Sequence, residues 1–106
     1  MALKITNNAF ATVPSAVTSI ATSLTVTTGQ GARFPTLGGS DYFYATLIDV
    51  TGNYEIVKVT ARTDDVMTLV RGQEGTLAIP FPANSRIELR VTAENISILN
   101  QDVLLL

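Results

Sequence analysis

Residues 41–62 read DYFYATLIDVTGNYEIVKVTAR, and this stretch decides the fold. Its first half is rich in the aromatic and β-branched residues that strands favour. Its second half alternates apolar residues, of which Ile56 is one, with polar residues such as Glu55 and Lys58. Only the turn-forming residues 51–53 separate the two halves, so the stretch predicts a β-hairpin.

Further strands are predicted on both sides of this hairpin. Residues 22–28 alternate, with Leu24 and Val26 on one face, and residues 86–91 alternate most regularly of all. Shorter strands are predicted at residues 3–6 and 66–70, and turns at residues 63–65, 72–75 and 83–85. Loops are predicted at residues 77–82 and at residues 14–19, where a short helix is the alternative. We therefore predict an all-β fold, a small β-barrel or β-sandwich, with a short C-terminal helix or an extended tail.

The composition excludes several classes of protein. The 106 residues make about one domain. The chain has no Cys or His, so disulfide scaffolds, structural zinc sites and Ser–His or Cys–His nucleophiles are excluded. The net charge of −2 argues against nucleic-acid binding. We expect no signal peptide, and the sequence holds no stretch of about 20 apolar residues. We expect no enzymatic activity and no cofactor.

The low charge raises the question of what covers the surface. Charged residues make up 15% of the chain, whereas globular domains usually carry about 25%. Threonine and serine are spread along the whole chain and cover part of this surface. Contacts with other copies or other proteins are expected to cover part of the rest.

The last residues differ from the others. We divide the chain into a β-rich docking domain, residues 1–92, and an oligomerisation or partner-binding segment, residues 93–106. Thr92 is a suitable helix N-cap, and the segment that follows contains neither Gly nor Pro. Its apolar residues fall at spacings of 3, 4 and 3, the pattern of a coiled-coil seam; they are Ile96, Leu99, Val103 and Leu106. The alternative is that the segment packs on its own barrel.

Other candidate sites have a structural and a functional interpretation. Arg71 and Glu74 lie around Gly72 and Gly75. They form either a glycine-shaped turn with a salt bridge or backbone hydrogen bonds, or a contact with a neighbouring subunit. The glycines of Gly29-Gln30-Gly31 lack the rest of a phosphate-binding motif and predict a turn. The acidic residues Asp64 and Asp65 show no calcium-loop spacing and predict another.

Three segments resemble a small β-rich attachment domain found near the start of tail-fibre proteins of tailed bacteriophages. They are SLTVTTGQGARFP at residues 23–35, DYFYATLID at 41–49, and EIVKVTAR at 55–62 with LVRGQEGT at 69–76. The likeness covers roughly residues 3–91, and its most specific part is the RGQEGT run. This sequence departs from the long-fibre pattern because it holds no fibre shaft or receptor-binding tip.

The resemblance implies a virion structural protein without enzymatic activity, a fibre initiator or adaptor that joins the tail or baseplate to a fibre, commonly as a homotrimer. Its partners would be other copies and other phage structural proteins, with no nucleic acid and no membrane, and its location the virion, in the tail or baseplate region. A capsid decoration (cement) protein is the alternative. A carbohydrate-binding module is a third hypothesis, with Tyr42, Tyr44 and Tyr54 as stacking candidates.

Overall fold

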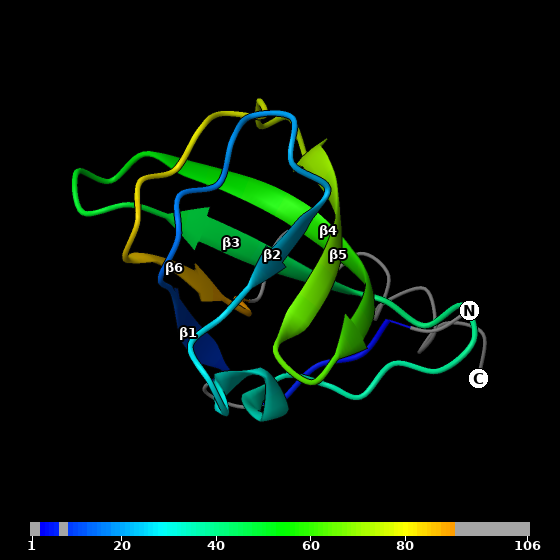
Figure 1. Cartoon of the computed structure of the whole chain (residues 1–106). Helices are drawn as coiled ribbons and strands as arrows, with labels where there is room; N and C mark the ends of the chain where they lie inside the picture. Colours follow the sequence, from blue (N-terminus) through cyan, green and yellow to red (C-terminus); the bar gives the residue numbers. More distant parts are fainter. Residues whose placement is uncertain (1–2, 7–8, 91–106) are drawn as a thin grey trace.

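The computed structural model describes residues 3–6 and 9–90. It is all-β, as predicted: six antiparallel strands form one sheet that is nearly closed into a barrel (Figure 1). The strands are β1 (Phe10–Val13), β2 (Ser23–Thr25), β3 (Phe43–Ile48), β4 (Tyr54–Thr63), β5 (Val66–Gln73) and β6 (Ser85–Glu88). A 3-10 helix, η1 (Gln30–Arg33), follows β2. No helix within these residues is long and apolar enough to cross a membrane.

The predicted hairpin is the centre of the sheet, whose order is β1-β6-β3-β4-β5-β2. β3 pairs with β4 from Phe43↔Val59 to Ile48↔Tyr54, and the turn between them is held by the carboxylate of Asp49. The second hairpin turns at residues 63–65, also as predicted. Local pattern and turn chemistry therefore place three of the six strands, β3, β4 and β5.

Two bulges bend the longest pair of strands. The pairing of β4 with β5 shifts between Ile56 and Lys58 and again between Val59 and Ala61. In the first shift Arg71 and Gly72 lie opposite Val57, and in the second Thr60 is the extra residue. Bulges increase strand bending and twist, which brings the outer strands of the sheet toward each other.

The last gap in the barrel is closed by hydrogen bonds between its two edge segments. The backbone N–H of Thr27, just after β2, donates to the carbonyl of Thr12 in β1 at 2.9 Å. The N–H of Thr12 in turn donates to Oε1 of Gln30 at 2.7 Å. A side-chain amide thus takes the place of a neighbouring strand, and we call this contact between Thr12, Thr27 and Gln30 the seam.

The core fills the inside of the barrel. It is made of one apolar side chain in two along the strands, together with Phe34 and Phe81 from the loops. Leu24 and Val26 share the inner face as predicted, and the ring of Phe34 stacks on Phe43 at 5.6 Å between centroids. Tyr44, on the other face of β3, is also buried, so both faces of this strand are covered.

The structure corrects several details of the prediction, which held no strand at the position of β1. Residues 3–6 form only an isolated bridge between Leu3 and Tyr42. The strand expected at residues 22–28 is only three residues long, and that expected at 86–91 is β6. The turn expected at residues 72–75 begins later, because β5 continues through the bulge at Gly72. The predicted oligomerisation or partner-binding segment, residues 93–106, lies outside the described residues.

Candidate functional site

One end of the barrel is formed by two loops, residues 14–22 and 74–80, which lie at the top of Figure 1. We call it the loop end. Val17 of the first loop exchanges two backbone hydrogen bonds with Phe81, just after the second, at 2.9 and 2.8 Å. The first loop contains no helix, in agreement with its prediction. The two loops are therefore joined to each other as well as to the barrel.

Glu55 lies beneath this end, with its side chain completely buried. In β4 it shares the inner face with Val57 and Val59, while Ile56 points the other way and is half-buried. The sequence pattern groups Glu55 with the polar residue Lys58 of this strand. That grouping is wrong, because the side chain of Glu55 points inward. The two valines set the phase of the strand, and a carboxylate at the next inward position needs a buried partner.

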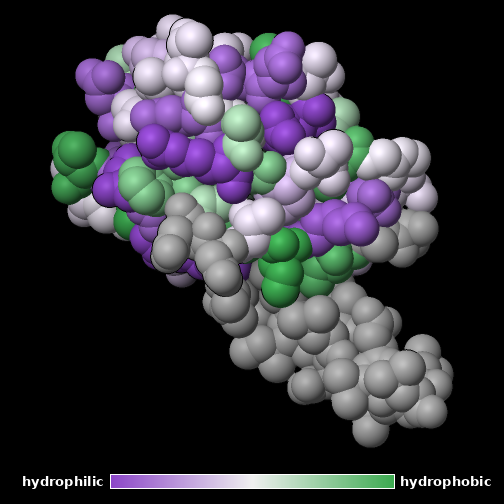
Figure 2. All heavy atoms as spheres, turned by 90° about the horizontal axis from the view of Figure 1, so that it is seen from below, coloured by the Kyte–Doolittle hydropathy of each residue, from purple (hydrophilic) through white to green (hydrophobic). Residues whose placement is uncertain are grey.

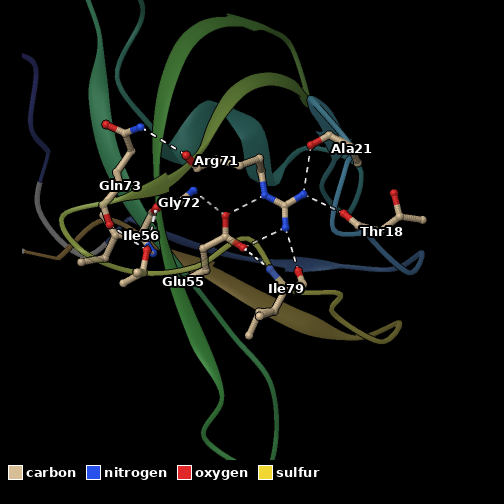
Figure 3. A network of polar contacts seen from close by, with 9 residues as sticks. Thr18, Ala21, Glu55, Ile56, Arg71, Gly72, Gln73 and Ile79 are labelled. Atoms are coloured by element: carbon tan, nitrogen blue, oxygen red, sulfur yellow. Dashed lines mark hydrogen bonds and ion pairs between the residues drawn. The ribbon is translucent and has the colours of Figure 1, made fainter.

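That partner is Arg71 of β5. Its Nε donates to Oε2 of Glu55 at 2.7 Å and its Nη2 to Oε1 at 2.8 Å, a bidentate pair (Figure 3). Two backbone N–H groups complete the carboxylate: Gly72 donates to Oε2 at 2.9 Å and Ile79 to Oε1 at 3.0 Å. Each carboxylate oxygen thus accepts two hydrogen bonds, which offsets the cost of its burial.

The other N–H groups of Arg71 hold the loops. Nη1 donates to the carbonyls of Thr18 and Ala21 at 2.7 and 3.0 Å, and Nη2 donates to the carbonyl of Ile79 at 2.7 Å. Figure 3 shows the guanidinium group between these loop carbonyls and the carboxylate of Glu55. One planar cation therefore links β4, β5 and both loops, and we call this network the Glu55–Arg71 clamp.

The electrostatics of the clamp keep Glu55 ionised. Burial alone raises the pKa of this carboxyl. The hydrogen bonds from Arg71, Ile79 and Gly72, and the positive charge of Arg71, outweigh burial and lower the pKa below its ordinary value. The clamp is accordingly an ion pair with a structural role, because every donor and acceptor in it faces another protein group and leaves none for a substrate.

The rest of the run at residues 71–76 also supports the loop end. Gly72 adopts a φ of 61° at the bulge, and a Cβ there would lie 3.2 Å from the carbonyl oxygen of Thr76. The hydroxyl of Thr76 accepts from the N–H of Ile56 at 3.0 Å and donates to the carbonyl of Gln73 at 2.7 Å. The most specific part of the family resemblance thus builds this one structural feature.

The candidate residues from the sequence lie in different places. Arg71 points inward and its side chain is only 8% exposed; its salt bridge is with Glu55 of β4 and not within the turn at residues 72–75. Glu74 is in the turn after β5 with a φ of 53°. Its contact with a neighbouring subunit stays a prediction. Ile96, Leu99, Val103 and Leu106 lie outside the described residues.

The loops that the clamp holds present two apolar side chains that sequence reasoning missed. Ile20 is 86% exposed and Leu77 is 78% exposed. Beside the first loop is a hollow of 290 Å³, lined by side chains between Val13 and Thr25. In the sequence, Ile20 has the spacing of a buried helix face with Val17 and Leu24, so its exposure to solvent is not evident. Leu77 is an isolated apolar residue in an irregular segment, and this was the available sign of an exposed apolar side chain.

The Gly29-Gln30-Gly31 turn binds an anion from within the chain. The N–H groups of Gly29 and Gly31 donate to the carboxylate of Asp65 at 3.1 and 2.9 Å. The turn is therefore structural, as predicted, and its N–H groups are occupied by a carboxylate. No cluster of three or more metal-ligating side chains is present among residues 3–6 and 9–90.

The three tyrosines differ in how much of their rings they expose. Tyr44 is buried against the edge of Tyr42, with 5.7 Å between centroids. The ammonium group of Lys58 lies 4.5 Å from the centre of the Tyr42 ring. Tyr54 is 56% exposed at the start of β4. The three rings do not form a common exposed platform for a sugar.

Comparison with known proteins adds no family. No protein-family model matches the chain, and no curated protein matches it.

Proposed function

We propose that this chain is a structural protein of a bacteriophage virion, a tail-fibre initiator or adaptor that joins the tail or baseplate to a fibre. The observation that carries the proposal is the position of residues 71–76. This run, the most specific part of the family resemblance, supplies Arg71 of the clamp that holds the two loops exposing Ile20 and Leu77 at one end of the barrel.

The loop end is the surface we assign to docking on the tail or baseplate. Ile20 and Leu77 extend into solvent from loops already ordered by Arg71. An ordered loop loses little conformational entropy on binding, so it favours a stable attachment. The described part of the opposite side is mainly hydrophilic, as Figure 2 shows. The partner surface that we propose for the loop end is therefore apolar. Residues 93–106 are assigned the other contacts, with identical copies and with the fibre.

The proposed location is tested by labelling particles. Antibodies against the folded chain, detected with gold on purified virions of the phage that encodes it, should mark the tail or baseplate. Label spread over the capsid lattice would support a decoration protein, and particles without any label would exclude a virion protein of either kind. A glycan array screened with the same chain, with Tyr54→Ala as its control, tests the carbohydrate-binding alternative.

The docking surface is tested by substitution. Ile20→Lys and Leu77→Lys should each leave the fold intact, because both side chains are exposed, and should reduce incorporation of the chain into particles. The matched control is Val66→Lys, which adds the same charge at a half-exposed apolar residue of β5. Equal incorporation of all three variants would contradict docking through the loop end.

A further inference from the structure

The edge of β2 that faces away from β5 carries backbone groups without a partner strand. On its β5 side, β2 is joined at every second residue: the carbonyl of Thr22 accepts a hydrogen bond at 2.7 Å and the N–H of Val26 donates one at 2.9 Å. The backbone groups of successive residues in a strand point to opposite sides. The N–H and C=O groups of Ser23 and Thr25 therefore point away from β5, toward β1.

The gap between β1 and β2 stays open beside these groups. The seam joins the two edges at Thr12 and Thr27, and its antiparallel register would next place Pro14 opposite Thr25. Pro14 has no N–H to donate to the carbonyl of Thr25. Among the described residues, no backbone hydrogen bond joins Pro14 to Thr25 in the other direction either. The backbone of Ser23 and Thr25, which we call the open edge, is therefore left for another chain to pair with.

The hollow of 290 Å³ lies along this open edge. Residues 13 and 15–18 line it on the β1 side, and residues 21 and 23–25 line it on the β2 side. None of these nine residues is charged, so the hollow offers no counter-ion to a charged ligand. Its N–H and C=O groups repeat at the two-residue spacing of a strand edge, and the groups complementary to them are those of an extended backbone. The occupant that fits is an uncharged peptide segment in β conformation.

We propose that an extended, uncharged segment of the tail or baseplate partner pairs with the open edge and lies in this hollow. The hollow belongs to the loop end, because Val17, Thr18 and Ala21 of the first loop line it and the same loop exposes Ile20. Arg71 already holds the carbonyls of Thr18 and Ala21, so this wall is ordered before binding. Pairing of this kind rests on the proposed function, docking through the loop end, and adds the form of the segment that the partner contributes.

A proline at position 25 tests the proposal in the full chain. Thr25→Pro removes the N–H that faces the hollow but leaves the pairing of β2 with β5, which does not use that group. Thr25→Ala is the matched control, because it changes the side chain and keeps the N–H. Incorporation of Thr25→Pro into particles should be roughly fivefold lower than that of Thr25→Ala, the effect of losing about one backbone hydrogen bond. Equal incorporation of the two variants would overturn the proposal.

Hydrogen exchange of the wild type gives a second test that does not depend on the folding of a variant. Mass spectrometry should show slower exchange in the fragment with Ser23 and Thr25 when the chain is in purified particles than when it is free. Equal exchange in the two samples would overturn the proposal. Exchange that slows in the free chain as its concentration rises would also overturn it, because the open edge would then pair with a second copy.

These outcomes separate the pairing from the docking on which it rests. Reduced incorporation of Ile20→Lys, together with equal incorporation of Thr25→Pro and Thr25→Ala, would support docking through the loop end and refute strand pairing. Particles that carry no gold label would instead refute the proposed function itself, and the pairing with it.

Discussion

At the scale of single residues, the clamp shows how a buried charge is accommodated. Burying a lone carboxylate costs several kcal/mol, and an ion pair repays this only when its remaining donors and acceptors are satisfied. Glu55 accepts hydrogen bonds from Arg71, Gly72 and Ile79, and Arg71 uses its other N–H groups on loop carbonyls. The pair therefore holds the loops, and removing either partner leaves the other charge buried without its counter-ion.

Removing the arginine should be strongly destabilising. We expect Arg71→Met to lower the free energy of unfolding by about 3–5 kcal/mol, because it leaves the Glu55 carboxylate buried without its counter-ion. Urea denaturation measures this change. Arg90→Met is the control, since the side chain of Arg90 is 48% exposed and its ion pair with Glu88 should contribute no more than about 1 kcal/mol. Similar losses in the two variants would contradict the structural role of the clamp.

The clamp also makes stability depend on pH in a defined direction. The folded-state pKa of Glu55 lies below its ordinary value of 4.5, so the unfolded chain binds its proton first as the pH falls. This contribution to stability is complete above pH 4.5 and is lost as the pH falls through the folded-state pKa.

Denaturant midpoints measured across the acid range should therefore fall less steeply for Glu55→Gln than for the wild type. Asp49 also has a lowered pKa, mainly through its hydrogen bond from Thr51, but it is present in both proteins and cancels in the comparison. Parallel curves for the two proteins would be inconsistent with an ionised Glu55 in the clamp.

Gly31 is required because the backbone beside it is too close for a side chain. A Cβ built on Gly31 would collide with the carbonyl group of Asp64. We expect Gly31→Ala to cost roughly 3 kcal/mol in thermal or urea unfolding, because the turn at residues 63–65 would have to move. At Gly38 a Cβ would meet no atom within 4 Å, so Gly38→Ala is the matched control and should be nearly neutral.

At the scale of elements, the barrel closes through a side chain. β1 and β2 are the edges of the sheet, and Gln30 supplies the acceptor that a further strand would supply to Thr12. An exposed strand edge invites pairing with another chain, so the seam also protects the monomer unit from unwanted edge contacts. Gln30 and Asp65 together fix η1 against the end of the barrel.

Substituting Gln30 should open this seam. Gln30→Leu removes the acceptor for the N–H of Thr12, and we expect a loss of about 1–3 kcal/mol with faster hydrogen exchange at that amide. Gln30→Glu keeps a side-chain oxygen at the same position and should retain most of the protection. Exchange at Thr12 that is slow in both variants would show that the side chain of Gln30 is not needed for closure.

At the scale of the whole molecule, the question is how copies associate. Deletion of residues 93–106 should change the mass in solution from oligomer to monomer, because these residues hold the predicted apolar coiled-coil pattern. Leu99→Asp should act in the same direction, since an unpaired charge in such a contact costs several kcal/mol. Light scattering measures both, and a truncated chain that keeps its oligomeric state would refute the role assigned to this segment.

Much of the fold was predictable from the sequence because its signals are local. The two hairpins follow from period-two patterns and from short polar turns at residues 51–53 and 63–65. Gly29 and Gly72 each follow a short apolar-Thr-apolar run and precede a Gln. Both adopt a positive φ, at 86° and 61°. Their roles differ, since Gly29 precedes η1 whereas Gly72 lies in a bulge within β5.

The sequence by itself determined an all-β chain with a central hairpin, because side-chain alternation and turn residues act over a few positions. Only the tertiary structure decided that Glu55 points inward to Arg71, that Gln30 closes the barrel, and that Asp65 occupies the Gly29–Gly31 turn. Each of these groups meets a partner at least 16 residues away in the sequence. A polar residue shows no local sign of such a partner, because its burial becomes favourable only when the folded chain brings the two together.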